Sequence, residues 1–262
     1  MAKIVFFQPH PDDLEFNCGH LIHFLSTKSV KNHIIKIASI TKGEFGLPGF
    51  KYDKFKGEFL AKIRTKELFS ALSIHGISPK DVHFFGYFDG FVKFNQELIN
   101  SITQYLNEEK PDIIFAPEAL YSWYQHKDHV NTGKAIYYII KNELIDFKPK
   151  LYFYGTLFPN FRFGFKSEDF KLIDDLLLCH KTQFWLLNRL KLTYKFTVRR
   201  AALKLSGWKY AEKYRRLYFL NKNQAKNNPP FLVKLLTHWY SSMPWFKAQY
   251  PRELLKKINE DI

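Results

Sequence analysis

The chain has 262 residues, of which 46% are hydrophobic, and its 40 Lys and Arg against 25 Asp and Glu give a formal net charge of +15. This composition predicts a globular protein with a large core and excludes a disordered chain, and a count of only two cysteines excludes a disulfide framework. The sequence opens without a signal-peptide pattern, and no apolar stretch approaches the roughly 20 residues that cross a bilayer, so we expect a cytoplasmic protein.

Short apolar runs alternate with helical patterns through the first 180 residues. Runs rich in β-branched and aromatic residues predict strands at 3–7, 33–41, 82–87, 112–116 and 151–156. The spacing of apolar residues predicts helices over 58–75, 95–109 and 130–141. Because strands that alternate with helices indicate βαβ units, we predict an α/β, Rossmann-like three-layer fold with a mostly parallel sheet.

A histidine and two aspartates follow the first predicted strand, in the segment Gln8-Pro9-His10-Pro11-Asp12-Asp13. Ligands of an open α/β sheet bind beyond the carboxyl ends of its strands, and imidazole with carboxylate suits a cation such as zinc. A dinucleotide site would need G-x-G-x-x-G here, and two carboxylates would repel a phosphate, so we exclude nucleotide binding. For this segment alone, an ordinary turn without chemistry remains the alternative.

A second polar cluster, Tyr124-Gln125-His126-Lys127-Asp128-His129, follows the strand predicted at 112–116 and leads into a helix. Two histidines and an aspartate within four residues of a loop are difficult to explain by packing. Both clusters belong to the same sheet edge, and together they offer the three nitrogen and oxygen ligands typical of a catalytic zinc, with room for a water. The pair therefore predicts a metal or catalytic site.

The paired motif His10-Pro11-Asp12-Asp13-Leu14-Glu15 and His126-x-Asp128-His129 resembles the PIG-L/LmbE-like family of zinc-dependent N-deacetylases, which remove acetyl groups from N-acetylglucosamine moieties. Shorter matches follow in order: Thr41-x-Gly43-Glu44, Arg64-x-x-Glu67, Asp89-Gly90, His180-x-Thr182-Gln183 and Tyr210-Ala211-Glu212. The resemblance covers residues 3–212, and its paired motif is the specific part.

The resemblance implies a Zn²⁺ cofactor and a division of labour among the motif residues. By it, the zinc ligands are His10, Asp13 and His129. Asp12 is then the general base, and His126 faces the reacting carbonyl. Zinc lowers the pKa of a bound water from about 15.7 towards about 7, which suits amide hydrolysis at neutral pH. We expect Asp128 to orient His126 and to favour its charged form.

The resemblance also implies that Glu44, Arg64 and His180 bind substrate. From the residues alone, Arg64 and Glu67 share a helix face and would form an exposed ion pair equally well. His180 would by itself be a partly buried histidine at a helix end.

Two positions depart from the family pattern. His20 stands where the family commonly has a second glycine after the first motif, and Tyr124 stands where an acidic residue is common before the second. We expect both to reshape the walls of the substrate pocket.

The last third of the chain has a different composition. Residues 181–262 carry 18 Lys and Arg against 4 Asp and Glu, a balance of +14, and four of the five tryptophans. We predict helices over 190–206 and 209–220, an apolar aromatic segment at 231–240 and a last short helix from Pro251.

This region has several interpretations. Residues 181–262 are a basic, mainly helical extension that packs on the catalytic domain, or they bind an anionic membrane, a glycolipid or a polyanionic glycan. Nucleic acid has a suitable charge but is not expected, because the motif indicates a sugar.

The sequence as a whole predicts a catalytic domain over 1–180 and the basic region over 181–262. The expected function is metal-dependent hydrolysis of an N-acetyl or other N-acyl group of an amino sugar, within a glycoconjugate or lipid-linked substrate. Peripheral association with the inner face of the membrane through 181–262 is expected with a lipid-linked substrate. The alternative is a catalytically inactive membrane- or polyanion-binding module with the same fold.

Overall fold

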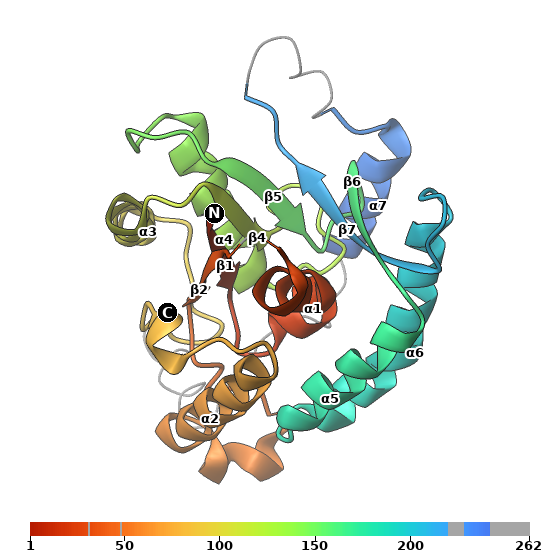
Figure 1. Ribbon diagram of the computed structural model, residues 1–262. Coiled ribbons are helices and arrows are strands. Elements are labelled where there is room, and N and C mark those ends of the chain that lie inside the picture. The colour runs from red at the N-terminus through yellow and green to blue at the C-terminus, as the bar shows by residue number, and fades with distance from the viewer. Residues whose placement is uncertain (31, 48, 220–227, 242–262) are drawn as a thin grey trace.

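Seven strands form one mixed sheet in the order β3-β2-β1-β4-β5-β7-β6 in the computed structural model, which describes residues 1–30, 32–47, 49–219 and 228–241 (Figure 1). The strands are β1 (Lys3–Gln8), β2 (Ile34–Ser39), β3 (Val82–Phe84), β4 (Ile113–Pro117), β5 (Lys150–Tyr154), β6 (Phe161–Phe165) and β7 (Tyr210–Arg216). The first five strands pair in parallel, and β7 is antiparallel to β5 and β6. The predicted mostly parallel α/β sheet is confirmed.

Helices cover both faces of the sheet (Figure 1). They are α1 (Asp13–His23), α2 (Glu58–Ile74), α3 (Gln96–Glu109), α4 (Lys127–Lys141), α5 (Lys171–Cys179), α6 (Phe184–Ala202) and α7 (Phe231–Ser241). Helices α1 and α2 bury their apolar faces on one side of the sheet and α3 and α4 on the other, while α5 packs against α1 and α2. The architecture therefore has the three layers that the alternating pattern predicted.

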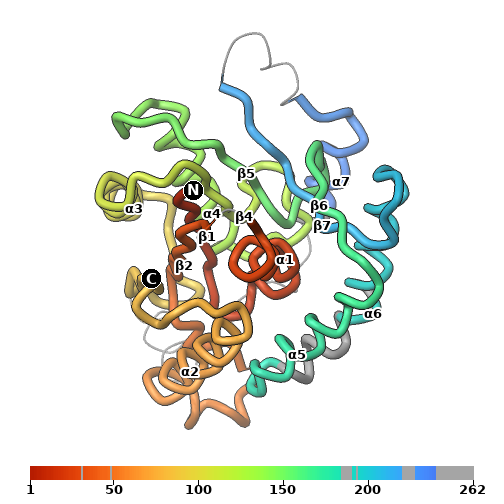
Figure 2. The backbone as a smooth tube through the Cα atoms, in the orientation of Figure 1, coloured from red at the N-terminus to blue at the C-terminus, as the bar shows by residue number. Residues whose placement is uncertain are grey.

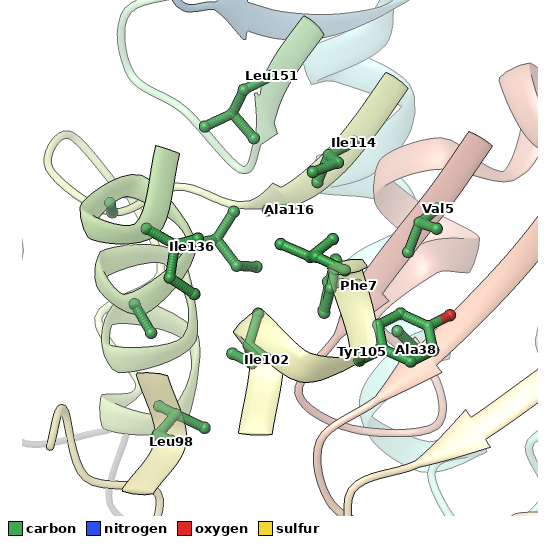
Figure 3. Packing of buried hydrophobic residues seen from close by; sticks show 14 of the residues in the cluster. Val5, Phe7, Ala38, Leu98, Ile102, Tyr105, Ile114, Ala116, Ile136 and Leu151 are labelled. Carbon is green, nitrogen blue, oxygen red and sulfur yellow. The ribbon is translucent and has the colours of Figure 1, made fainter. Parts of the chain in front are cut away.

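The central strands contribute apolar side chains to both layers. In β1, Val5 and Phe7 point into the layer of α3 and α4, and Ile4 and Phe6 point into the layer of α1 and α2. Figure 3 shows Val5 and Phe7 packed with side chains of α3 and α4. A strand buried on both faces needs a continuous apolar run, which is why residues 4–7 lack the alternation of a half-exposed strand.

The helix predicted at 209–220 is wrong, because residues 210–216 form strand β7 between β5 and β6 (Figure 2). Tyr210 and Tyr214 lie four residues apart, a spacing that fits one face of a helix and one face of a strand equally well. The charged Glu212 between them lies on the same strand face and is buried against α1. Only the tertiary partner of Glu212 distinguishes the two patterns.

The apolar segment at 231–240 forms α7, and the short helix predicted from Pro251 lies outside the described residues. No helix within the described ranges is long and apolar enough to cross a membrane.

Candidate metal and catalytic site

Four loops meet at the carboxyl edge of the parallel strands and carry the polar residues of the site. His10 and Asp12 follow β1, Glu44 follows β2, Asp89 follows β3, and His126 follows β4. The motifs that the sequence places after separate strands are therefore brought together at the sheet edge where α/β proteins bind their ligands.

The three predicted zinc ligands, His10, Asp13 and His129, lie in mutual contact. His129 Nε2 is 3.1 Å from Asp13 Oδ1 and 3.3 Å from His10 Nδ1, and His10 Nδ1 is 3.5 Å from Asp13 Oδ2. Tetrahedral zinc with bonds of about 2.0–2.1 Å places adjacent ligand atoms about 3.3 Å apart. The donor set and its spacing therefore fit a zinc ion.

Electrostatics keep Asp13 in the form that binds a cation. Burial alone would raise the pKa of its carboxyl, but His129 and His10 hold that pKa well below its usual range. The first residue of α1 is Asp13 itself, where the helix dipole favours a negative charge. The backbone N–H of His10 also donates to Asp13 Oδ2 at 2.7 Å.

A second layer of carboxylates orients His10. Its Nε2 lies 3.1 Å from Asp128 Oδ2 and 3.2 Å from Asp89 Oδ1. Asp128 is fixed in turn, because the backbone N–H groups of Gly90 and Val92 donate to its two oxygens. A carboxylate on the far nitrogen of a ligand histidine sets its tautomer, so Nδ1 of His10 is left free to bind a metal.

Asp12 stands beside the three ligands but has a different partner. The Arg64 guanidinium donates to Asp12 Oδ1 at 2.8 Å and to the carbonyl oxygen of Gly43 at 2.9 Å. Burial raises the pKa of Asp12, and the charge of Arg64 opposes that rise. Arg64 is 2% exposed, so the alternative of a surface ion pair with Glu67 is wrong.

Gly43 is needed where it stands. It has a φ of +64°, a region that favours glycine, and a Cβ there would collide with the guanidinium of Arg64. The loop after β2 can therefore approach Arg64 closely enough to accept its hydrogen bond.

His126 is the N-cap of α4, and its Nδ1 accepts from the backbone N–H of Asp128 at 3.3 Å. Burial and the neighbouring His10 lower the pKa of His126 to about 4. The Asp128 carboxylate is 3.9 Å from His126 Nδ1 but 3.1 Å from His10 Nε2. Asp128 therefore holds His126 through its backbone N–H, while its carboxylate contacts His10. The expectation that Asp128 favours a charged His126 is corrected, because His126 is neutral and carries its proton on Nε2.

Glu44 and Asp89 connect the loops after β2 and β3. Asp89 N–H donates to Glu44 Oε1, and Phe45 N–H donates to Asp89 Oδ2, each at 3.2 Å. Glu44 Oε2 is buried and has no hydrogen-bond partner among the described residues. Asp89 received no role from the sequence, although an Asp-Gly pair directly after a predicted strand was the available signal.

His180 is fully buried at the end of α5, with its Nε2 2.9 Å from Glu15 Oε1. A direct contact with substrate, as predicted, does not fit this burial. The positive charge of His180 acts on Asp12 instead, where it opposes the rise of the carboxyl pKa. The neighbouring Thr182 donates to both oxygens of Glu67, which explains why Glu67 does not pair with Arg64.

The two departures from the family pattern have different outcomes. His20 is buried away from the metal-ligand group, where its ring stacks on Phe165 with centroids 3.5 Å apart, so the expectation that it shapes the pocket is wrong. Tyr124 does belong to the site, because its ring stands edge-on to His129 at 4.5 Å.

The region of this chain that matches a known protein family contains both polar clusters. A family model described as PIG-L, GlcNAc-PI de-N-acetylase, matches residues 5–140, which is half of the chain and includes both clusters. The chain belongs to the PIG-L family. The family resemblance of the sequence is thereby confirmed.

This PIG-L chain also has a curated relative and solved structural neighbours. Diacetylchitobiose deacetylase of Thermococcus kodakarensis is 24% identical over 133 residues, covering 51% of this chain and only 47% of the relative. The structure of N,N'-diacetylchitobiose deacetylase from Pyrococcus horikoshii, complexed with an inhibitor, has a TM-score of 0.71 and 22% identity over 82% of this chain and 84% of that one.

A neighbour with another activity has the same fold. The 4-carboxy-2-hydroxymuconate hydratase of Pseudomonas putida has a TM-score of 0.61 and 16% identity, covering 83% of this chain and 97% of that one. Likeness at these identities shows the fold alone, so the reaction has to be argued from the site residues.

Proposed function

We propose that this protein is a zinc-dependent amide hydrolase that removes an N-acetyl or other N-acyl group from an amino sugar. The observation that carries the proposal is the contrast between adjacent aspartates. Asp13 contacts the two histidines of the ligand group, whereas Asp12 is held beside that group by Arg64. A metal-ligand triad with a separate buried carboxylate is what a metal-assisted hydrolase requires.

The zinc would be held by His10, Asp13 and His129, whose nitrogen and oxygen atoms fit it by type and spacing. When bound, zinc supplies a water of lowered pKa and polarises a carbonyl oxygen.

Asp12 is suited to move the proton. Arg64 occupies Oδ1, which leaves Oδ2 to accept a proton from the attacking water and to deliver it to the leaving amine nitrogen. His126, neutral with its proton on Nε2, is suited to donate a hydrogen bond to the carbonyl oxygen as negative charge develops there. Both groups are fixed before substrate arrives, because each is held by contacts within the protein.

Glu44 is suited to hold the sugar, whereas Arg64 is buried and bonded to Asp12 and Gly43, so it positions Asp12 instead. The buried Oε2 of Glu44 has no donor within the described part of the chain, and an unsatisfied buried acceptor costs about 1–3 kcal/mol until a substrate hydroxyl occupies it. The family description, GlcNAc-PI de-N-acetylase, and the relative named diacetylchitobiose deacetylase support an N-acetylated amino sugar as the substrate class. A glycoconjugate or lipid-linked form of that sugar is our finer proposal.

The test is acetate release by the zinc-loaded protein from a panel of free N-acetylglucosamine, its glycosides and its glycolipids. We expect Asp12→Asn to lower kcat by about 10²–10⁴-fold while the metal content stays the same. Asp146→Asn, an exposed aspartate paired with Lys110, is the matched control and should retain activity. A wild-type rate in Asp12→Asn would show that another group moves the proton.

A second candidate, a membrane- or polyanion-binding module without catalysis, is favoured by the basic region at 181–262. Its helix α7 exposes Phe231, Leu232 and Trp239 to solvent. A protein that binds anionic vesicles, lacks zinc after purification without chelators and releases no acetate from the panel would support this candidate over the hydrolase.

A further inference from the structure

Exposed aromatic side chains lie on three segments that adjoin the site: the stretch from the loop after β2 to the first turn of α2, the loop after β3 and the loop after β4. These side chains, here called the aromatic rim, are between 36% and 66% exposed and are Phe50, Phe55, Phe59, Phe88 and Trp123. Large apolar side chains gathered beside a polar site mark a binding surface more often than an isolated exposed residue does.

The rim is connected to the site by short chains of contacts. The N–H of Gly57, between Phe55 and Phe59, donates to the carbonyl oxygen of Glu44 at 2.9 Å. Phe88 directly precedes Asp89, which contacts His10. The ring of Trp123 lies 5.6 Å from that of Tyr124, which stands on His129. Each part of the rim is therefore connected to a residue of the site.

The rim segment after β2 is also positively charged. Its exposed lysines Lys42, Lys51 and Lys54 form no ion pair with a described residue, and each ammonium lies over an aromatic ring at 4.8–5.7 Å. Of the three acidic residues of the segment, Glu44 is buried, Asp53 pairs with Lys56 and Glu58 pairs with Lys62. The free charge of this surface is therefore cationic.

We propose that the aromatic rim docks on the surface of an anionic phospholipid membrane, with rings in the interface and lysines against the headgroups. Aromatic side chains with interleaved lysines are the composition that binds such an interface. The unpaired lysines favour a lipid surface over a neutral glycan, which would gain nothing from them. This inference rests on the proposed function in one respect: it means that the amino sugar is presented at a membrane, which makes a lipid-linked substrate the class to test.

The experiment measures binding of the full-length protein to sedimented vesicles of phosphatidylglycerol and phosphatidylcholine, without any turnover. We expect the triple variant Phe50→Ser, Phe55→Ser, Phe59→Ser to lower the vesicle partition coefficient by about tenfold or more. Lys51→Gln with Lys54→Gln should weaken binding to these vesicles by about tenfold and leave binding to pure phosphatidylcholine unchanged. Hydrolysis of a short soluble N-acetylglucosaminide by the rim variants should stay within about twofold of wild type.

The matched control is Leu192→Ser with Phe196→Ser, two exposed apolar residues of α6 in the basic region. The proposal is overturned if this control loses vesicle binding while the rim variant keeps it, because the contact would then lie in residues 181–262. It is also overturned if no variant changes binding, or if the rim variant loses affinity only for a soluble chito-oligosaccharide. Since vesicle binding needs no catalysis, loss of acetate release in Asp12→Asn tests the hydrolase separately from the docking.

Discussion

Asp12 and Asp13 are neighbours in the chain, but their partners differ. Asp13 begins α1 and contacts His129 and His10, which hold the pKa of its carboxyl well below its usual range. Asp12 is the N-cap residue of α1, in the turn before the helix, and contacts Arg64. The turn between strand and helix sends the two carboxylates in different directions, so one motif can supply both the proposed metal ligand and the proposed base.

Arg64 has a geometric task that a lysine could not perform. Its Nη2 holds Asp12 and its Nη1 holds the carbonyl of Gly43, which needs a planar group with two separate donors. We expect Arg64→Lys to lower kcat/KM for acetate release by about 10–100-fold, because one of these contacts is lost. The matched control is Lys62→Gln on the same helix, whose exposed pair with Glu58 is far from any reacting group. Unchanged kcat/KM in Arg64→Lys would mean that the charge alone suffices.

His75 makes stability depend on pH. It is 2% exposed at the end of α2, and burial lowers its pKa to about 4. An unfolded histidine has a pKa of about 6.5. As the pH falls, the unfolded chain therefore takes up the proton before the folded chain does. The contribution of neutral His75 to folding stability is complete above about pH 6.5 and is lost as the pH falls towards about 4.

Through His75, the free energy of unfolding is about 2 kcal/mol lower near pH 5 than at neutral pH. Urea unfolding near pH 7 and near pH 5 measures it. His75→Gln should reduce the difference between the two free energies of unfolding by about that amount. His33→Gln serves as the control and should leave the difference as in wild type. An equal pH dependence in wild type and His75→Gln would refute the assignment.

At the scale of elements, a buried ion pair ties β7 to the loop after β4. Arg215 Nε donates to Glu118 Oε2 at 2.8 Å, and Arg215 Nη2 donates to Glu118 Oε1. Both side chains are at most 1% exposed. Glu118 directly follows β4 in the segment that leads to His126, so a strand from the basic region steadies the loop that carries a site residue.

Breaking this pair should be costly because it leaves a charge buried and uncompensated. We expect Glu118→Gln to reduce the free energy of unfolding by about 3–5 kcal/mol, and the double variant Glu118→Leu, Arg215→Met to recover part of the loss. Urea titration of both variants gives these values. Glu168→Gln, which removes one partner of an exposed pair with Lys166, should leave the midpoint unchanged. If Glu118→Gln were as stable as wild type, water would have to reach the ion pair.

At the scale of the whole molecule, the site joins distant parts of the chain. His10 follows strand β1 and His129 lies in helix α4, 119 residues further along the chain, yet their ring nitrogens are 3.3 Å apart. A ligand that binds both residues stabilises the native state, since the unfolded chain does not bring them together.

Metal removal should therefore lower the unfolding temperature. Binding at a hundred times the dissociation constant adds about 2.7 kcal/mol, and we expect chelation to reduce Tm by several degrees and added Zn²⁺ to restore it. Differential scanning calorimetry with and without chelator measures this shift. His129→Gln should have the same Tm in both conditions, and His83→Gln, away from the ligand group, should respond as wild type does. A shift that survives in His129→Gln would place the cation elsewhere.

The sequence alone predicted the first five strands, three of the four helices between them and the two polar clusters that contain the metal-ligand candidates. These features follow from local rules: apolar periodicity selects the element, and in a parallel sheet the residues that follow each strand must meet at one edge. Asp12 could be separated from Asp13 only through the family resemblance, because two adjacent carboxylates have the same local pattern.

Only the tertiary structure decided which groups face each other. Tyr210 to Arg216 have a spacing that suits either element, and they became a strand because the edges of β5 and β6 offered hydrogen-bond partners. Arg64, His180 and Asp128 were each singled out in the sequence, but their partners lie far away along the chain, at Asp12, Glu15 and His10. The energy of a buried charge depends on its neighbours in space, and for these residues a linear sequence does not contain that information.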